Sequence, residues 1–404
     1  MSELPDCVYF DLYLKNYSNS NETKTPVRFY EPRQSNIIDD CSQYNLSIVR
    51  FNVNSSCLPV YQAEILPGET QSNADLMMAS LSMEIYRGNA GSTVYSTGPI
   101  NLFWVPQDLS ISKPDPPSAN KSRGNIQSNS DYYYCYNYDH LLKIVNTAFQ
   151  TATTMFSEFD EYFAKMPAPF LTWDIASQSA ILICKQNTFS TDRIYPSTEG
   201  DKEVFVKIYF NRSLYNLFST FYFIKQNGLS VQKYTGRSYN ELEMDYQLMV
   251  DSFYDTNALQ LSNSNVQPLN RYLAIKQMES TVAAINCVAS IMFLSDAIPI
   301  LSSNQNKPTI LFNNSTVNYQ HSGLQDSYAN VISDFSPDSI VRSNLYYVPT
   351  GSNRYISLTS NRQSLRTIDL TVMWADTWGQ LHPFFLQSGA SASVKILFEK
   401  KKLL

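Results

Sequence analysis

Residues that commonly perform acid–base or nucleophilic chemistry are few and scattered in this 404-residue chain. The sequence has three histidines, His140, His321 and His382, and each stands alone. Neither a G-x-S-x-G turn nor a cysteine-centred nucleophile signature accompanies any of them. Packing is the simpler role for His140, which lies next to Leu141 at the start of an expected helix.

Two groups of carboxylates provide an alternative chemistry. Glycoside hydrolysis needs a pair of carboxyl groups on either side of the scissile bond. The candidate groups are Glu158/Asp160/Glu161 and Glu241/Glu243/Asp245, with Asp174 as a further candidate. Their spacing is more typical of the solvated edges of helices, and we favour that interpretation.

Metal and nucleotide sites lack support in the sequence. The six cysteines occur singly, without a C-x-x-C pair, so no zinc site is predicted and most are expected to be buried thiols: Cys7, Cys41, Cys57, Cys135, Cys184 and Cys287. With only 12 glycines, the chain contains neither a Walker A loop nor a G-x-G-x-x-G loop. We therefore predict no catalytic residue, no cofactor-binding residue, no metal ligand and no cofactor.

Two further segments could contact a ligand. The tyrosine-rich run 131–138 presents flat rings that suit a sugar, a base or a protein surface, but it is equally typical of a strand that leads into a helix. The tail Lys400-Lys401-Lys402 is a candidate for weak contact with packaged nucleic acid, although three terminal lysines are more often simply solvated.

The composition limits the classes of protein. Charged residues make up 16% of the chain and aromatic residues 13%, with 28 Tyr and 22 Phe, which argues against disorder and coiled coils. The net charge of −6 disfavours an overall attraction to nucleic acid or an anionic membrane. The N-terminus lacks a signal-peptide pattern, so the chain is expected to stay in the compartment that makes it. The apolar stretch 282–301 is interrupted by polar residues and predicts no membrane span.

The elements that must position these residues are mostly strands. Val8, Phe10, Leu12 and Leu14 alternate with Tyr9, Asp11 and Tyr13, the period of a strand with one buried face. The same reasoning predicts strands over 46–53, 80–86, 100–105, 170–175, 180–184, 204–210, 356–358, 368–374, 381–386 and 394–398. Steps of three and four predict one long amphipathic helix over 139–165, capped by Asn137 or Asp139. Residues 214–224 are predicted to be buried, without a choice between helix and strand.

Many short strands and one helix favour a mainly β protein, either a sandwich or an antiparallel jelly roll. Because one roll needs only about 150 to 200 residues, the length predicts either one roll with large insertions or two rolls in tandem. The expected regions are an N-terminal β region over 1–137 with an exposed loop near 110–130, a helix plus β region over 138–330, and C-terminal strands over 331–404 that complete a roll.

The order of several segments resembles capsid proteins of small eukaryotic DNA viruses of the polinton-like and adintovirus kind. The resemblance extends over most of the chain and is carried by hydrophobic and turn patterns in segments 44–51, 58–60, 138–146, 168–174, 208–218, 290–300, 333–335, 368–376 and 394–398.

The resemblance implies a non-enzymatic structural protein of an icosahedral virion with a jelly-roll fold. Its partners would be copies of itself and other capsid proteins, and synthesis would take place in the host cytoplasm or nucleus. A penton-type or minor subunit is the leading expectation, and a major capsid protein with a double jelly roll is an alternative. From the residues alone, a receptor- or glycan-binding spike and a β-sandwich carbohydrate enzyme also stay open.

Overall fold

The computed structural model divides the chain into two compact units. The first unit comprises residues 1–60 and 286–404, and the second comprises residues 61–285. The structure describes residues 6–17, 24–68, 74–87, 92–116, 130–159, 166–189, 204–225, 245–250, 272–300, 309–312, 315–316, 330–337, 344–350, 352–377 and 380–401.

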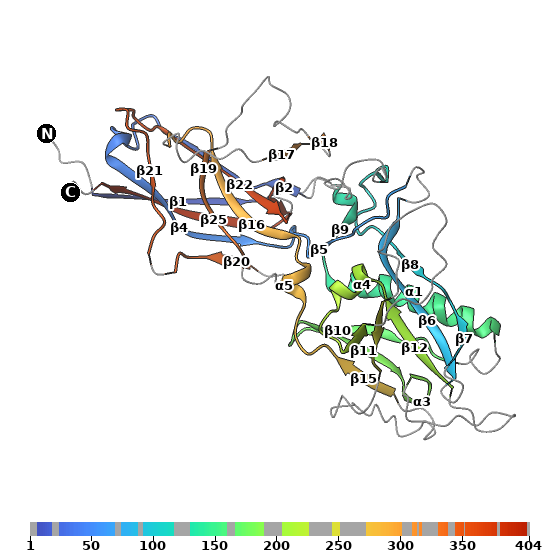
Figure 1. Ribbon diagram of the computed structural model, residues 1–404. Helices are drawn as coiled ribbons and strands as arrows, with labels where there is room; N and C mark the ends of the chain where they lie inside the picture. The colour runs from blue at the N-terminus through green and yellow to red at the C-terminus, as the bar shows by residue number, and fades with distance from the viewer. Residues whose placement is uncertain are drawn as a thin grey trace. The chain divides into compact units, whose positions relative to one another are not determined.

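Eight strands in two sheets form the body of the first unit (Figure 1). One sheet has the order β1-β25-β4-β20, formed by Cys7–Lys15, Ser391–Lys400, Tyr44–Asn54 and Asn344–Tyr347. The other contains β3, β22, β16 and β19, formed by Arg28–Pro32, Thr367–Asp376, Val288–Ser295 and Asn330–Phe335. All the pairings among these eight strands are antiparallel.

The pairing order identifies this unit as a jelly roll. Among the eight strands, the first pairs with the last (β1 with β25) and the second pairs with the seventh (β3 with β22). The third pairs with the sixth and the last (β4 with β20 and β25), and the fourth pairs with the seventh (β16 with β22). This alternation of early and late strands is how a jelly roll interleaves its two sheets.

Shorter elements extend the two sheets or, as β2 and β24 do, form a separate two-stranded sheet. They are β2 (Lys24–Pro26) paired with β24 (Phe385–Gln387), β21 (Ile356–Ser357) on β4, β23 (Gln380–Pro383) on β22, β17 (Thr309–Phe312) on β23 and β18 (Ser315–Thr316) on β17, with the 3-10 turn η1 at Cys41–Gln43.

Aromatic side chains fill the space between the two sheets. Phe51 on β4 is fully buried and meets Phe293 on β16 edge to face, with ring centroids 4.9 Å apart. Phe335 on β19 lies 6.1 Å from both rings and stacks on Tyr347 of β20 at 4.5 Å. The rings therefore join strands of both sheets across the core.

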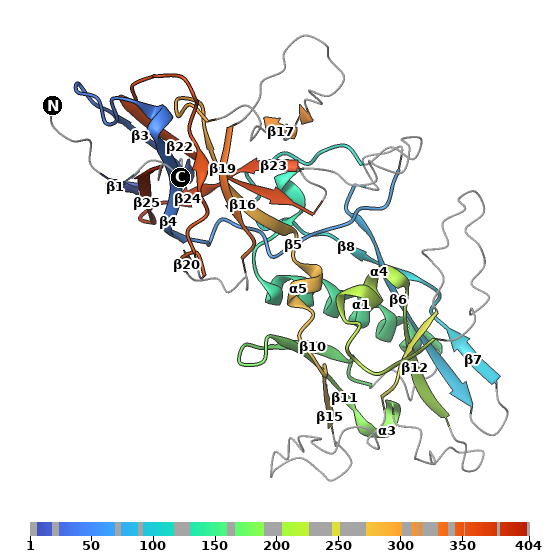
Figure 2. The same cartoon turned by 60° about the vertical axis from the view of Figure 1, so that its left-hand side comes forward.

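The described residues of the second unit form two larger sheets, a two-stranded sheet of β5 and β9, and the longest described helix (Figure 2). The larger sheet has the order β13-β14-β12-β6-β7, with β8 also on β6: Phe223–Lys225, Tyr246–Leu248, Val204–Phe210, Leu76–Arg87, Ser92–Ser96 and Ile100–Phe103. The smaller sheet is β10-β11-β15: Phe170–Asp174, Ser179–Lys185 and Tyr272–Lys276. The remaining elements are β5 (Tyr61–Gln62), β9 (Tyr134–Cys135), η3 (Asp131–Tyr133), α3 (Gln186–Phe189), α4 (Arg212–Leu217) and α5 (Val282–Ile285).

Helix α1 (Tyr138–Phe159) is the long amphipathic helix expected from the sequence. Asn137 accepts a hydrogen bond from the backbone N–H of His140 at 2.7 Å and so caps the helix. The apolar stripe is buried against β8 and β10, as in Val145, Phe149 and Phe156. Asn146 binds β10 directly: its amide donates to the Leu171 carbonyl at 2.9 Å and accepts from the Leu171 N–H at 2.7 Å. The last expected residues, 160–165, lie outside the described residues.

The expected jelly roll is confirmed, in the arrangement of one roll with a large insertion. The second unit lies in the chain between β4 and β16, and its described strands do not repeat the pairing order of the first unit. The limits of the units, at 60/61 and 285/286, differ from the expected limits near 137/138 and 330/331, because strands from both ends of the chain pair with one another. The undecided segment 214–224 contains the end of α4 and the start of β13, and the expected exposed loop is described only up to residue 116 and at residue 130.

Candidate functional site

The two described histidines are fixed by packing and hydrogen bonds. His140 donates from Nε2 to the Val105 carbonyl at 2.7 Å and meets the Trp104 ring edge on, and burial lowers its pKa. His382 lies in the buried hairpin of β22 and β23, where Nε2 is 3.1 Å from Asp376 Oδ2 and the ring stacks on Trp374 at 4.2 Å. His321 lies outside the described residues.

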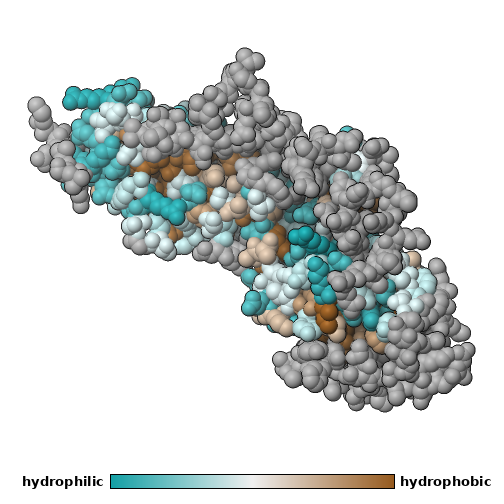
Figure 3. Space-filling view, in the orientation of Figure 1, coloured by the Kyte–Doolittle hydropathy of each residue, from teal (hydrophilic) through white to brown (hydrophobic). Residues whose placement is uncertain are grey.

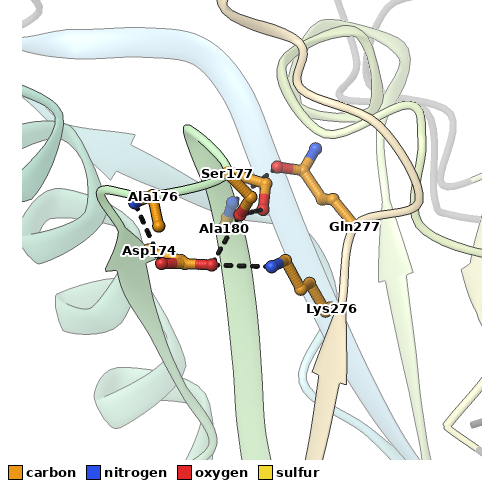
Figure 4. A network of polar contacts seen from close by, with 7 residues as sticks. Asp174, Ala176, Ser177, Ala180, Lys276 and Gln277 are labelled. Carbon is orange, nitrogen blue, oxygen red and sulfur yellow. Dashed lines mark hydrogen bonds and ion pairs between the residues drawn. The ribbon is translucent and has the colours of Figure 1, made fainter. Parts of the chain in front are cut away.

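Of the carboxylates considered for hydrolysis, Asp174 has the best-defined environment (Figure 4). One oxygen is 2.6 Å from Lys276 Nζ and accepts from Ser177 Oγ at 2.6 Å, while the other accepts from the Ala176 N–H at 3.1 Å. The hydrogen bonds from Lys276 and Ser177 lower the pKa of Asp174 to about 2. A carboxyl group with so low a pKa is ionised at neutral pH and is a poor general acid. The contacts of Asp174 instead connect the β10–β11 turn to Lys276 on β15.

The structure describes the surroundings of the other carboxylate candidates only in part. Asp245 precedes β14, and Glu158 lies on α1, where only its backbone is described. The remaining members of the two acidic groups, Asp160, Glu161, Glu241 and Glu243, lie outside the described residues.

The tyrosine-rich run 131–138 packs inside the second unit. Tyr132, Tyr133 and Tyr134 are buried, and Tyr138 stacks on Trp173 at 4.3 Å. The Tyr133 hydroxyl donates to the Ala74 carbonyl at 2.6 Å. Burial and the hydrogen bond to Asp75 raise the pKa of Tyr132 to about 12. These buried rings present no face to a sugar or a base, so the ligand-stacking interpretation of this run is not supported.

The cysteines follow the expectation that most are buried. Cys41, Cys135, Cys184 and Cys287 are buried, and burial together with Asp40 raises the pKa of Cys41 to about 11. In the part of the chain that the structure describes, no three His, Cys, Asp or Glu side chains are grouped so as to hold a metal ion. No described helix is both long and apolar enough to cross a bilayer.

The most distinctive surface of the first unit is the outer side of the β1-β25-β4-β20 sheet. Along β1 the side chains alternate, so that Leu12 points into the sandwich and Tyr9, Asp11 and Tyr13 point outward. We use the name tyrosine face for these outward side chains of the sheet: Tyr9, Asp11, Tyr13 and Lys15 of β1, Ser393, Lys395 and Glu399 of β25, Arg50 and Asn52 of β4, and Tyr346 of β20.

One cross-strand row defines the tyrosine face. Tyr13 is opposite Ser393, Ser393 is opposite Asn52, and Asn52 is opposite Tyr346. With about 4.8 Å between strands, the row is about 14 Å long, with small polar side chains between two tyrosines. Tyr13 is 74% exposed and Tyr346 is 65% exposed, so both rings are available for contact.

A charged row lies beside the tyrosines. Asp11, Lys395 and Arg50 are opposite one another on three adjacent strands. Asp11 accepts from Arg50 Nη2 at 3.1 Å and lies 3.3 Å from Lys395 Nζ. Lys395 Nζ is also 5.3 Å from the centre of the Tyr9 ring, within cation–π range. The ion pairs are partly exposed and stabilise the fold only weakly, but they orient the side chains of the tyrosine face.

Sequence reasoning found the outward residues of β1 through their alternation, but it did not single out Tyr346. The strand β20 has only four residues, too short for a clear period. Figure 3 shows the hydropathy of the exposed residues, with hydrophilic and apolar side chains mixed over the surface. Nothing in the local sequence distinguishes an outward tyrosine on a short strand from a buried one.

The interleaved strand order places the protein among the jelly-roll proteins, a class that includes viral capsid and lectin domains. Residues 8–400 match the model of the Sputnik minor capsid protein V18/19 family. The chain therefore belongs to this family of viral capsid proteins, and the expectation of a minor capsid protein is confirmed.

Similar proteins agree with this assignment. The chain is 27% identical over 151 residues to the uncharacterized protein V18 of Sputnik virophage, covering 37% of this chain and 83% of that protein. Its fold matches a chain in the cryo-EM structure of the Sputnik virophage with a TM-score of 0.75 and 23% identity, over 98% of this chain and 99% of that one. It also matches the mavirus penton protein with a TM-score of 0.57 and 13% identity, over 98% and 100% of the two chains.

Proposed function

We propose that this protein is a non-enzymatic subunit of an icosahedral viral capsid and that it assembles into a closed, penton-type ring with copies of itself, next to other capsid proteins of the virion. The observation that carries the proposal is the family match over residues 8–400, which includes both the jelly roll and the insertion. The likeness of the fold to the mavirus penton protein supports the ring. Closed rings of identical subunits form through contacts between two different surfaces of neighbouring copies.

The physical properties of the chain suit a shell subunit. Subunit contacts favour aromatic residues over lysine and glutamate, and here 13% of residues are aromatic and only 16% are charged. Exposed tyrosines occur on β1 and β20 of the roll, as in Tyr9, Tyr13 and Tyr346. Synthesis in the host cytoplasm or nucleus, followed by incorporation into the virion, is part of the same proposal.

Contact of Lys400–Lys402 with the genome is not part of this proposal. The backbone N–H of Lys400 donates to the Asp6 carbonyl at 2.8 Å, and Lys401 Nζ donates to the Ser42 carbonyl at 2.8 Å. Lys402 lies outside the described residues. The described part of the tail thus serves the sandwich itself.

The ring is tested by size-exclusion chromatography with light scattering and by negative-stain electron microscopy of the purified full chain. We expect particles whose mass is more than twice the 46.1 kDa of one chain, and images of closed rings. A glycan-binding spike would instead show saturable binding on a glycan array. A chain that stays monomeric at high concentration and binds a small ligand would contradict the proposal.

A further inference from the structure

We propose that the tyrosine face is the surface through which one copy of this chain binds the next copy of the ring, an inference that rests on the proposed function. The contact is heterologous: the tyrosine face of one copy meets a different, acidic surface of its neighbour. Three observations support this inference: the exposed area of the tyrosines, the contacts that hold Tyr9 and the charged row, and the charge of the tyrosine face.

The three tyrosines of the tyrosine face expose a substantial area to solvent. Tyr9, Tyr13 and Tyr346 are 54%, 74% and 65% exposed, so each leaves on the order of 100 Å² of ring surface open. A stable interface buries about 800 Å² on each partner, and tyrosines are enriched among the residues that dominate the binding energy. The three rings thus supply a large part of one contact, and the small side chains of Ser393 and Asn52 let a partner approach between them.

Tyr9 and the charged row of the tyrosine face have partners within the sheet before any other copy binds. Asp11 is held between Arg50 and Lys395, at 3.1 and 3.3 Å, and Lys395 lies over the Tyr9 ring. At the end of β1, Lys15 Nζ lies 5.0 Å from the centre of the Tyr17 ring. Ordering side chains is one of the main costs of association, and a surface that is already ordered avoids part of it.

The charges favour a second copy in a heterologous arrangement. The outward strand residues of this sheet include three cationic side chains, Lys15, Arg50 and Lys395, and two carboxylates, Asp11 and Glu399. The chain as a whole carries −6, so the rest of a neighbouring copy is acidic on average and complements this small positive excess. Two tyrosine faces placed against each other would bring like charges together, which disfavours a two-fold dimer.

The test compares association of the full-length chain with that of variants over a concentration series, using light scattering and analytical ultracentrifugation. Tyr13→Ser/Tyr346→Ser removes both ends of the tyrosine row, and we expect the concentration needed for ring formation to rise at least about 100-fold. Tyr30→Ser is the matched control, since Tyr30 is 62% exposed on β3 of the other sheet. We expect it to assemble like the unmodified chain. All three side chains are exposed, so circular dichroism and the thermal midpoint should stay unchanged.

A second measurement is independent of any variant. Nitration by tetranitromethane, located by mass spectrometry, should modify Tyr13 and Tyr346 in diluted monomers and spare them at least tenfold in rings, while Tyr30 reacts equally in both. Rings that form unchanged in the double variant, or that leave Tyr13 and Tyr346 reactive, overturn the assignment of the tyrosine face and leave the ring itself standing. An unmodified chain that forms no ring overturns both proposals.

Discussion

We expect Phe51→Ala to lower the free energy of unfolding of the first unit strongly. Phe51 is fully buried on β4, with its ring 4.9 Å from Phe293 of the opposite sheet and 6.1 Å from Phe335. Replacement by alanine removes the side chain that links the two sheets at this level and leaves a cavity the size of a benzene ring. The neighbouring rings of Phe293 and Phe335 are buried on paired strands, so they can move only slightly into the space.

The size of the effect follows from these contacts. Removal of a buried phenylalanine costs about 3 to 5 kcal/mol, and the loss of two ring contacts places Phe51 near the upper end, at about 5 kcal/mol. With a urea dependence of about 2 kcal/mol per molar, the midpoint for unfolding of the first unit should fall by about 2.5 M. Phe51→Leu keeps most of the apolar volume and should lose only about 1 to 2 kcal/mol.

The assay is urea unfolding followed by hydrogen exchange and mass spectrometry, which separates peptides of the two units. Peptides from β4 and β16 should show the shifted midpoint, whereas peptides from β6 and β12 of the second unit serve as an internal reference. A shift below about 0.5 M for Phe51→Ala, or equal shifts for the alanine and leucine variants, would show that these rings do not join the two sheets as described.

Three further predictions concern the second unit. Asn146→Ala leaves the N–H and carbonyl of Leu171 without their partner, so we expect a loss of about 2 to 4 kcal/mol and faster hydrogen exchange at the Leu171 amide. Burial raises the pKa of Glu84 above its ordinary value of 4.5; the stability that this shift contributes is present below pH 4.5 and is lost as pH rises through the higher pKa of the folded state. Between pH 4.5 and pH 7, the urea midpoint of the unmodified chain should therefore fall more than that of Glu84→Gln. Equal falls in the two chains would contradict the raised pKa of Glu84. The opposite sign holds for Asp174, whose pKa is lowered to about 2: its contribution is present above pH 4 and lost toward pH 2, so the thermal midpoints of the unmodified chain and Asp174→Asn should converge over that range.

The sequence predicted those elements that have a clear period. The alternation of Val8 to Leu14 corresponds to β1, the strict alternation of 368–374 to β22, and the three-and-four spacing of 141–156 to α1. These patterns arise because one face of each element is buried, and burial of one face fixes the side-chain period whatever the partner. The short strand β20 has too few residues to show a period, and its existence depends on pairing with β4.

The mainly β architecture and the capsid family were thus accessible from the order of the apolar patterns alone. The pairing of β1 with β25 was not, because strands separated by more than 370 residues are joined only by the closing of the roll, and that closing makes residues 61–285 an insertion. The tyrosine face depends on the same step: Tyr13 and Tyr346 form one row only after β25 and β4 have come between their strands. A local pattern records which side of a strand is buried, whereas the neighbours across a sheet are set by the topology of the whole chain.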